Sequence, residues 1–251
     1  MSATDLGGLA PLVPDLLAGG SLAVLTGAGV SAESGLSTFR GPGGLWEGQS
    51  AMDLATPEAF EEDAARVWRF YEWRREQVRR ARPNAGHEAL ARIEKVLPQM
   101  TLITQNVDGL HRAAGSKNVL ELHGTILLTR CTGCGAREAG PDAPFPSLPP
   151  RCACGSVLRP DVVWFGEALP DGVFEAAAGA AQRSAVFLVA GTSSVVAPAS
   201  SLATLAARGG AKVFEINPEE TPLAPLADGC FRASASAVLP LLAEALERGA
   251  A

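Results

Sequence analysis

The sequence predicts an α/β protein in which helices cover both faces of a parallel sheet and a small cysteine-rich module is inserted. Three observations support this class. Short apolar runs alternate with helical segments, the first run leads into the glycine turn Gly27-Ala28-Gly29, and four of the five cysteines fall within 131–154. A length of 251 residues fits one such domain with an insertion better than two full domains.

The strands expected in this sheet are short runs of Leu, Val, Ile and Ala. Parallel strands are apolar on both faces because helices cover both sides of the sheet. Such runs occur at 21–26, 100–104, 119–122, 185–190 and 212–216. Residues 162–165 are also expected to be extended.

Three segments carry the apolar periodicity of helices, at 64–82, 87–97 and 239–248. In the first of them, spacings of three and four place Val67, Tyr71, Arg74 and Val78 on one face. Residues 35–50 are rich in Gly, Ser and Pro and predict a long loop, which in a compact domain is usually functional. Residues 125–160 have many Pro and Gly and little periodicity, and they are the candidate inserted module.

The bulk composition bears on location and partners. Hydrophobic residues make up 47% of the chain and charged residues 19%, which is typical of a protein that buries a core. A net charge of −6 argues against a nucleic-acid binder. Apolar runs are shorter than the roughly 20 residues that span a bilayer, and the N-terminus resembles neither a secretory signal nor a transit peptide. We therefore expect a cytoplasmic protein with no nucleic-acid or membrane partner.

The motif Gly27-x-Gly29-x-x-Ala32 follows the first strand and precedes a helix. There it fits a cradle for dinucleotide phosphates, in which glycines permit a tight turn and free backbone N–H groups meet the pyrophosphate. An ordinary glycine-rich turn would explain the motif equally well. A dehydrogenase would place an acidic residue after a second strand roughly 20 residues on, but a loop at 37–44 stands there, which disfavours hydride transfer.

The four clustered cysteines form two knuckles, Cys131-x-x-Cys134 and Cys152-x-Cys154, separated by residues 135–151. In a chain with no export signal, such a cluster indicates metal ligands rather than disulfides. Four thiolates suit a tetrahedral, structural Zn²⁺ site. The second knuckle is tighter than usual, and Cys230 is most simply a small buried side chain.

Polar residues follow two of the predicted strands. Gln105, Asn106 and Asp108 come after 100–104, and His123 comes after 119–122. In open α/β sheets, chemistry occurs beyond the carboxyl ends of the strands. His123 is the best candidate for a general base, because imidazole titrates near neutral pH.

The other two histidines have weaker claims to chemistry. His87 lies within a predicted helix, and packing is the favoured explanation for it. His111 follows the strand end at 100–104, where a structural hydrogen bond and a catalytic role are equally plausible.

Tyr71 and Arg74 share the apolar face of the first predicted helix. An Arg on such a face needs an anionic partner or a route to water. That partner is either an internal carboxylate or the carboxylate of a ligand held by Tyr71 and Arg74 together. Arg75 and Arg79 fall off this face and are expected to be solvated.

As a set, these motifs resemble the sirtuin family. The resemblance rests on residues 27–40 (GAGVSAESGLSTFR), 105–111 (QNVDGLH), 121–124 (ELHG), 191–193 (GTS) and 216–217 (IN), in that order, and it covers the chain from about 20 to 240. Tyr71-x-x-Arg74 matches the pair of the class III branch, which removes succinyl and malonyl groups. Ala55 matches the small residue that widens its acyl pocket.

The resemblance implies one sirtuin-type catalytic domain over 1–251. Its Rossmann-like part would cover about 1–50, 84–125 and 160–251, a small helical part about 51–83, and the zinc module about 126–159. NAD would bind in the cleft between the parts and be consumed as a co-substrate, with Zn²⁺ structural. The protein is expected to be a monomer.

The implied reaction is removal of an acyl group from lysine. The acyl oxygen would attack C1′ of the nicotinamide ribose as nicotinamide leaves, with His123 as base on the ribose hydroxyls. Water would then release free lysine and 2′-O-acyl-ADP-ribose. Asn106 and Asp108 would hold the ribose and the nicotinamide amide, and the substrate peptide would add as a strand between 163–167 and 193–197.

The resemblance also implies two sets of binding residues. The cofactor set is Gly27, Ala28, Gly29, Ser31, Thr38, Phe39, Arg40, Trp46, Gln105, Asn106, Asp108, Gly191, Thr192, Ser193, Asn217 and Ala235. The substrate set is Ala55, Tyr71, Arg74, Val163, Phe165 and Gly166. The segment 231–236 lacks the Gly expected near the adenine, so Ala235 departs from the family pattern.

Two other functions fit the same scaffold. A protein mono-ADP-ribosyltransferase would share the NAD site, but the complete Tyr71–Arg74 pair favours deacylation of succinyl-, malonyl- and acetyl-lysine proteins. A non-catalytic NAD-sensing module would tolerate loss of the base, yet His123, Asn106 and Asp108 are all present.

Overall fold

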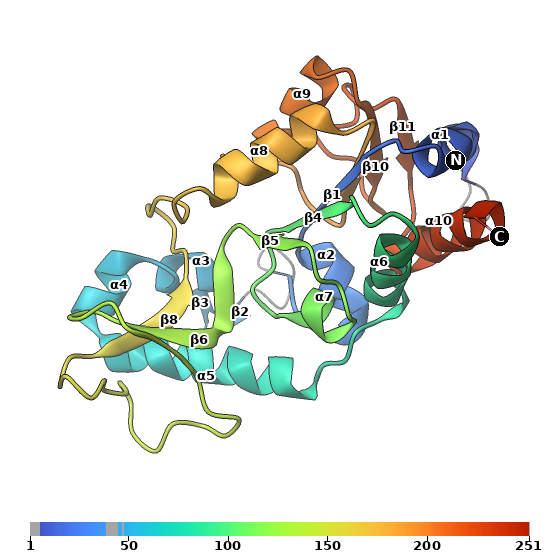
Figure 1. Cartoon of the computed structure of the whole chain (residues 1–251). Helices are drawn as coiled ribbons and strands as arrows, with labels where there is room; N and C mark the ends of the chain where they lie inside the picture. Colours follow the sequence, from blue (N-terminus) through green and yellow to red (C-terminus); the bar gives the residue numbers. More distant parts are fainter. Residues whose placement is uncertain (1–5, 39–44, 47, 251) are drawn as a thin grey trace.

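A six-stranded parallel sheet forms the centre of the protein (Figure 1). The computed structural model describes residues 6–38, 45–46 and 48–250. The strand order is β11-β10-β9-β1-β4-β5, and every pairing is parallel. The strands are β1 (Leu22–Thr26), β4 (Thr101–Thr104), β5 (Val119–Glu121), β9 (Val186–Ala190), β10 (Lys212–Ile216) and β11 (Gly229–Phe231). All five strand segments predicted from apolar runs are thereby confirmed.

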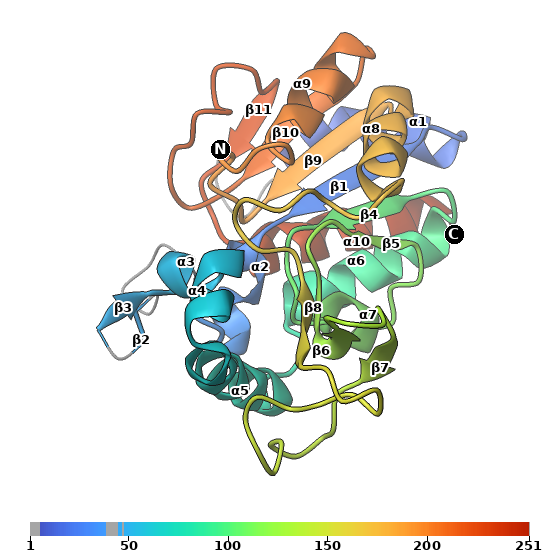
Figure 2. The same cartoon turned by 90° about the vertical axis from the view of Figure 1, so that its left-hand side faces the viewer.

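Helices cover both faces of this sheet, as predicted. Alternate residues of one strand point to opposite faces, so Val24 packs in one core and Leu25 in the other. The first core contains α1 (Val13–Leu17), α6 (Ala85–Val96) and α10 (Ala235–Ala250), preceded by η1 (Gly7–Leu12). The second contains α8 (Val173–Arg183) and α9 (Ser201–Arg208) (Figure 2).

A second group of elements, here called the small lobe, packs beside the sheet (Figure 1). Its helices are α3 (Ala51–Leu54), α4 (Pro57–Glu62) and α5 (Ala64–Arg80), and its strands β6 (Gly124–Cys131), β7 (Arg137–Ala139) and β8 (Leu158–Val162) form an antiparallel sheet in the order β7-β6-β8. The two-residue strands β2 (Leu45–Trp46) and β3 (Gln49–Ser50) pair beside α3. The small lobe has its own core, which includes Trp68, Phe70 and Tyr71 of α5 and Ile126 of β6.

Side-chain caps define where the long helices begin. The Asp63 carboxylate accepts the Arg66 N–H at 2.9 Å and starts α5. Asn84 starts α6 by accepting the N–H groups of Gly86 and His87, while the His87 ring accepts the Asn84 N–H. These caps place both helices within two residues of their predicted starts.

The order of the strands creates a crevice. From β1 the chain proceeds to β4 and β5 on one side, and it later returns through β9, β10 and β11 on the other. Loops that leave β1 and β9 therefore diverge at neighbouring carboxyl ends. Such a switch point is where open parallel sheets bind ligands.

Several elements were not predicted. The strands β6, β7 and β8 lie in the segment expected to lack regular structure, because most of their residues are polar or alternate irregularly in burial. Helices α8 and α9, which are rich in Ala, were also not predicted. Helix α10 begins four residues before its predicted start and contains Pro240.

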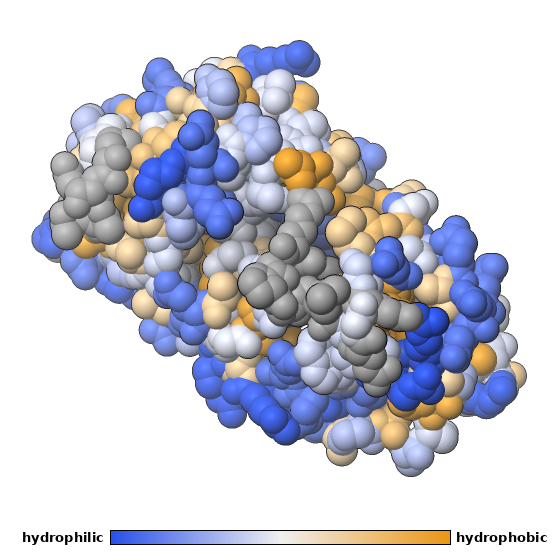
Figure 3. Space-filling model, turned by 180° about the vertical axis from the view of Figure 1, so that it is seen from behind, coloured by the Kyte–Doolittle hydropathy of each residue, from blue (hydrophilic) through white to orange (hydrophobic). Residues whose placement is uncertain are grey.

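Among the described residues, no helix combines the length and the apolar character that crossing a membrane requires. On the face shown in Figure 3, hydrophilic side chains occupy most of the outline, and hydrophobic ones occur in smaller groups between them.

Candidate active site

A cleft of about 880 Å³ opens at the switch point, between the carboxyl ends of the sheet and the small lobe. Its sheet-side wall consists of 27–38, 105–108, 123, 191–198, 217–222 and 234–235. Its small-lobe wall consists of Met52, Arg74, Val78, Ile126 and 163–169. His123 is the one histidine and Arg74 the one Arg or Lys among the described residues of these walls.

The glycines after β1 allow two loops to touch. A Cβ on Gly27 would lie 2.7 Å from the Thr192 Cβ, and one on Gly29 would lie 2.8 Å from the Gly191 carbonyl oxygen. Free backbone N–H groups were expected at the start of this helix, but those of the two glycines are not free. The Gly27 N–H donates to Ala190 and the Gly29 N–H donates to Gly191, at 3.1 and 2.8 Å, because the loops pack directly together.

A hydrogen-bonded network fixes the polar residues after β4. The Ser31 hydroxyl donates to Asp108 Oδ2 at 2.7 Å, and the Leu110 N–H donates to Asp108 Oδ1 at 2.9 Å. Asn106 Nδ2 donates to Gly27 O and Ser31 Oγ, each at 3.1 Å. In the described part of the chain no donor is recorded for Asn106 Oδ1, so this oxygen is available to a ligand hydroxyl.

His87 and His111 support this network from behind. His87 Nδ1 accepts the Asn84 N–H, so the proton lies on Nε2, which faces Ser31 Oγ at 3.3 Å. His111 Nε2 lies 2.9 Å from Thr26 Oγ1. Burial lowers the pKa of His87, and burial together with His87 lowers the pKa of His111 to about 3. Both imidazoles are therefore neutral, and neither lines the cleft, which favours the structural hydrogen bond for His111.

His123 is held for proton abstraction. Its Nδ1 lies 3.0 Å from the Gln105 carbonyl oxygen, which can only accept, so Nδ1 carries the proton and Nε2 has a free lone pair. Burial lowers the pKa of His123, and the bond to Gln105 only partly opposes this effect. The ring is therefore neutral at neutral pH, which is the form a general base needs.

Arg74 faces the cleft from the small-lobe wall, whereas Tyr71 is buried behind it. Arg74 lines the cleft, and burial lowers the pKa of its guanidinium while Tyr71 and Asp108 oppose that shift. Tyr71 is 3% exposed and does not line the cleft. Its hydroxyl accepts the Trp164 Nε1–H at 2.9 Å, and burial raises its pKa to about 12.

An ion pair behind the cleft holds the segment that follows β8. Arg159 binds Glu167 through two bonds, Nη1 to Oε1 at 2.6 Å and Nη2 to Oε2 at 2.8 Å. The Arg159 Cζ atom lies 3.4 Å from the centroid of the Trp164 ring. Glu167 Oε2 also accepts the Trp164 N–H, at 2.9 Å. This segment was predicted to be extended and to pair with the substrate peptide, but neither Arg159 nor Trp164 was identified as important.

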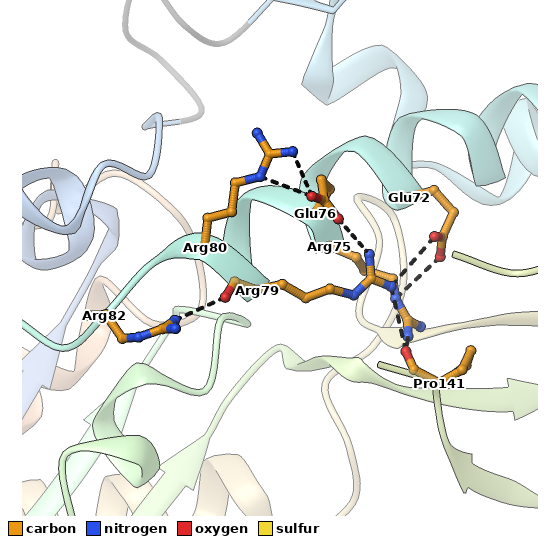
Figure 4. A network of polar contacts seen from close by, with 7 residues as sticks. All are labelled: Glu72, Arg75, Glu76, Arg79, Arg80, Arg82 and Pro141. Atoms are coloured by element: carbon orange, nitrogen blue, oxygen red, sulfur yellow. Dashed lines mark hydrogen bonds and ion pairs between the residues drawn. The ribbon is translucent and has the colours of Figure 1, made fainter. Parts of the chain in front are cut away.

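Arg75 and Arg79 are not solvated, contrary to the prediction. Arg75 is 3% exposed and donates to the Pro141 carbonyl at 2.8 Å (Figure 4). Its guanidinium also lies over the Phe145 ring. Glu72 approaches both guanidinium groups, at 3.2 Å from Arg75 and 3.6 Å from Arg79. The loop after β7 covers this side of α5, which helical periodicity alone could not reveal.

Most of the predicted ligand-binding residues line the cleft. Among the described ones, Trp46, Ala55 and Tyr71 do not line it and instead pack in the core of the small lobe. Trp46 lies edge-on to Phe70, and Ala55 accepts the Phe165 N–H through its carbonyl oxygen at 2.9 Å. Phe39 and Arg40 lie outside the described residues. The other predicted cofactor and substrate residues all line the cleft.

The loop after β10 forms part of the sheet-side wall of the cleft. Asn217 donates from Nδ2 to Thr192 O at 2.8 Å and accepts the Glu219 N–H at 3.1 Å, so its amide holds the loop in place. Below it, the buried Glu215 carboxylate pairs with Arg232 at 2.6 Å and accepts the Thr221 hydroxyl. The sequence reasoning missed this support because a carboxylate in an apolar strand carries no visible signal of its partners.

The four clustered cysteines converge, as predicted. Their sulfur atoms all lie within 4.8 Å of one another, with Cys131–Cys154 at 3.4 Å and Cys134–Cys152 at 3.8 Å. Zn–S bonds of about 2.3 Å in a tetrahedron require sulfur separations of roughly 3.8 Å. The tight Cys152-x-Cys154 knuckle therefore does not prevent a tetrahedral site, and the donor set fits a structural Zn²⁺.

Comparisons with known proteins agree with this geometry. The model of the Sir2 family matches residues 27–198. The chain is 51% identical to the NAD-dependent protein deacylase 2 of Pyrobaculum aerophilum over 94% of its own length and 95% of that protein. It resembles the structure of a Sir2 homologue–NAD complex (TM-score 0.90, 46% identity, 96% and 94% of the two chains) and a Sir2–p53 peptide–NAD⁺ structure (0.79, 32%, 94% and 96%). The chain therefore belongs to the Sir2 family.

Proposed function

We propose that the protein is an NAD-dependent protein-lysine deacylase that prefers acidic acyl groups, succinyl and malonyl, and retains deacetylase activity. The observation that carries the acyl preference is Arg74, a cation on an otherwise apolar stretch of the small-lobe wall beside Met52, Val78 and Ile126. Arg74 is half-buried in this wall, and a guanidinium there can bind the carboxylate of a ligand. The deacylase names of the relatives support the reaction class.

The sheet-side wall would hold the co-substrate. Its floor is made of small residues that leave room for a dinucleotide, and the glycines at 27 and 29 are required for its shape. Asn106 would offer Oδ1 to a ribose hydroxyl, and Asp108 would face the nicotinamide amide. NAD would supply a glycosidic carbon that the acyl oxygen can attack as nicotinamide leaves. Attack of a ribose hydroxyl and addition of water would then release free lysine and 2′-O-acyl-ADP-ribose.

His123 would act as the general base. Its Nε2 lone pair can take a proton from a ribose hydroxyl, and the Gln105 carbonyl then stabilises the imidazolium through Nδ1. The neutral ring persists at neutral pH because burial lowers its pKa. No reorganisation of the histidine is needed before proton transfer.

The acyl-lysine chain would enter between 163–167 and 193–197. Phe165 and Val195, one on each side of the entrance, are 39% and 47% exposed. An extended peptide could pair with both backbone segments and so direct its lysine side chain inward. The acyl end would then meet the wall that carries Arg74.

The test is a mass-spectrometric assay with NAD and matched succinyl-lysine and acetyl-lysine peptides, following peptide mass and free nicotinamide. We expect the wild type to remove succinyl faster than acetyl. Arg74→Met should lower kcat/KM for succinyl by about ten- to a hundredfold, the value of hydrogen bonds to a charged group, and change acetyl far less. Arg69→Met is the matched control, because Arg69 is on the same helix but its side chain is 52% exposed.

Each outcome has a distinct meaning. Equal loss of both activities in Arg74→Met would refute the role of Arg74 and leave the deacylase intact. Acetyl removal alone by the wild type would refute the acidic-acyl preference. NAD binding with no deacylation of either peptide would favour the ADP-ribosyltransferase or sensor alternatives.

A further inference from the structure

A buried carboxylate lies between the two segments that follow β10 and β11. Glu215 is the fourth residue of β10 and is fully buried. Strand alternation places it on the same face as Val213, which belongs to the apolar core that contains α8 and α9. A carboxylate in such surroundings is stable only when it is paired and hydrogen-bonded. The partners of Glu215 therefore show which parts of the chain this charge fixes.

These partners come from both segments. Thr221, in the loop after β10, donates its hydroxyl to Glu215 Oε1, and the same hydroxyl oxygen accepts the Leu223 N–H at 3.1 Å. Arg232, which directly follows β11, donates from Nη1 to Glu215 Oε2 at 2.6 Å. The same Nη1 donates to the Glu219 carbonyl oxygen at 3.2 Å. Glu215 thereby joins the loop after β10 to the segment after β11.

The two joined segments lie at one end of the cleft and His123 at the other. Residues 217–222 and 234–235 line the cleft beyond β10 and β11, whereas His123 follows β5. In the strand order β11-β10-β9-β1-β4-β5, four strand spacings separate β10 from β5, a distance of roughly 19 Å. A dinucleotide whose nicotinamide ribose lies at His123 therefore has its adenosine half beside the two joined segments.

We propose that Glu215 is a positioning residue for NAD: through Thr221 and Arg232 it holds the two segments that receive the adenosine half of the dinucleotide. Neither Glu215 nor Arg232 lines the cleft, so both act through these segments and not by touching the ligand. Because His123 lies at the opposite end, Glu215 determines the affinity for NAD and not the rate of the chemical step. The inference rests on the proposed function, since it assumes that NAD occupies the sheet-side wall.

Glu215→Gln tests this role, because it keeps the shape of the side chain and an acceptor for Thr221 but removes the charge that pairs with Arg232. We expect KM for NAD to rise about tenfold, the value of one hydrogen bond to a charged group. The kcat at saturating NAD and the KM for the peptide should remain close to wild type. Calorimetry with ADP-ribose, which carries the adenosine half and lacks nicotinamide, should show the same loss of affinity without any turnover.

Two further variants keep the test decisive. Arg232→Met removes the other member of the ion pair, and the Arg232 side chain is 32% exposed, so the fold should tolerate the change. If both residues act through one ion pair, the double variant Glu215→Gln/Arg232→Met should bind ADP-ribose no worse than the poorer single variant. Lys212→Met is the matched control, because Lys212 pairs with Asp228 at 2.8 Å on the same strand, but at the end away from the cleft.

An unchanged KM for NAD and an unchanged affinity for ADP-ribose in folded Glu215→Gln protein would overturn the inference. So would a fall in kcat with no change in KM, an equal effect of Lys212→Met, or additive effects in the double variant. The melting temperature identifies the folded protein, and Arg232→Met provides the measurement if Glu215→Gln does not fold. Failure of the proposed function is distinguishable: a wild type that binds ADP-ribose without deacylating either peptide would refute that function, and calorimetry would still decide the role of Glu215.

Discussion

On the sheet side of the cleft, short polar side chains hold one another through hydrogen bonds, whereas on the small-lobe side long cationic side chains lie against aromatic rings and carboxylates. Ser31, Asn106 and Asp108 belong to the first wall, and their bonds are mutually satisfied. Behind the second wall, Arg75 lies over a Phe ring beside Glu72, and Arg159 lies over a Trp ring beside Glu167.

The physical basis of this difference is side-chain length. Short groups at strand ends take their positions from the backbone of the sheet, so little conformational freedom remains to be lost. Long guanidinium side chains must be held by several weak contacts, which can be altered without moving the sheet. We infer that the first wall supports a reaction common to all acyl groups and the second distinguishes among acyl groups.

The largest expected effect comes from removing a zinc ligand, which should unfold the zinc module on the small-lobe side and leave the parallel sheet folded. Cys134→Ala should abolish zinc binding and the hydrogen-exchange protection of 124–162, because zinc sites contribute about 10 kcal/mol or more to the folding of small modules. Protection in β1, β4, β9 and β10 should persist. Metal analysis and exchange mass spectrometry measure both, with Cys230→Ala as the matched control. Stoichiometric zinc in Cys134→Ala would contradict the assigned ligand set.

The next largest effect comes from replacing His123, the proposed base of the sheet-side wall. His123→Tyr should lower kcat for succinyl and acetyl peptides alike by about 10²–10⁴-fold or more, since a positioned base contributes that much. The melting temperature and NAD binding should remain close to wild type. Turnover retained in this variant would exclude His123 as the base.

A third effect tests the ion pairs of the small lobe. Arg75→Met leaves Glu72 with only the more distant Arg79, at 3.6 Å, as a cationic partner, so we expect the free energy of unfolding to fall by up to about 3 kcal/mol. The double variant Arg75→Met/Glu72→Met should recover much of this loss, because no unpaired charge remains. Urea unfolding gives the values, and Arg80→Met, whose side chain is 78% exposed, is the control. A double variant as unstable as the single one would refute the mechanism.

The smallest expected effect is a loss of folding stability at acidic pH, caused by the two buried histidines behind the sheet-side wall. The pKa of His87 and that of His111, about 3, are lowered in the folded protein by burial. Below the unfolded-state value of about 6.5, the unfolded chain binds protons that the folded chain does not, so stability falls by up to about 1.4 kcal/mol per pH unit for each histidine. This stability is fully present above pH 6.5 and is lost as the pH falls.

Urea unfolding at pH 7.5, 6.5 and 5.5 measures this dependence. His111→Gln keeps a donor for Thr26 and should reduce the slope by about one proton. A slope that does not change in the variant would show that His111 becomes protonated within the folded protein.

Much of the sheet side of the cleft could be predicted because the sequence patterns that specify it span only a few neighbouring residues. An apolar run such as 212–216 must be a buried strand, and the polar residues after such strands must meet at one edge. His123, Asn106 and Asp108 were therefore identified without any knowledge of distant contacts. The four cysteines were predictable for the same reason, since their spacing encodes the knuckles.

The sequence by itself determined the parallel sheet, the glycine turn and the clustering of the four cysteines, because each follows from periodicity or spacing within a few residues, and it singled out His123 as the candidate base. The tertiary structure alone decided the fates of Arg75, Arg159 and Tyr71. Helical periodicity says which face a residue occupies but not what covers that face, and the covering segments come from residues 141–145 and 162–167. The partner of a buried charge depends on packing between segments far apart in the chain, so only the folded structure reveals it.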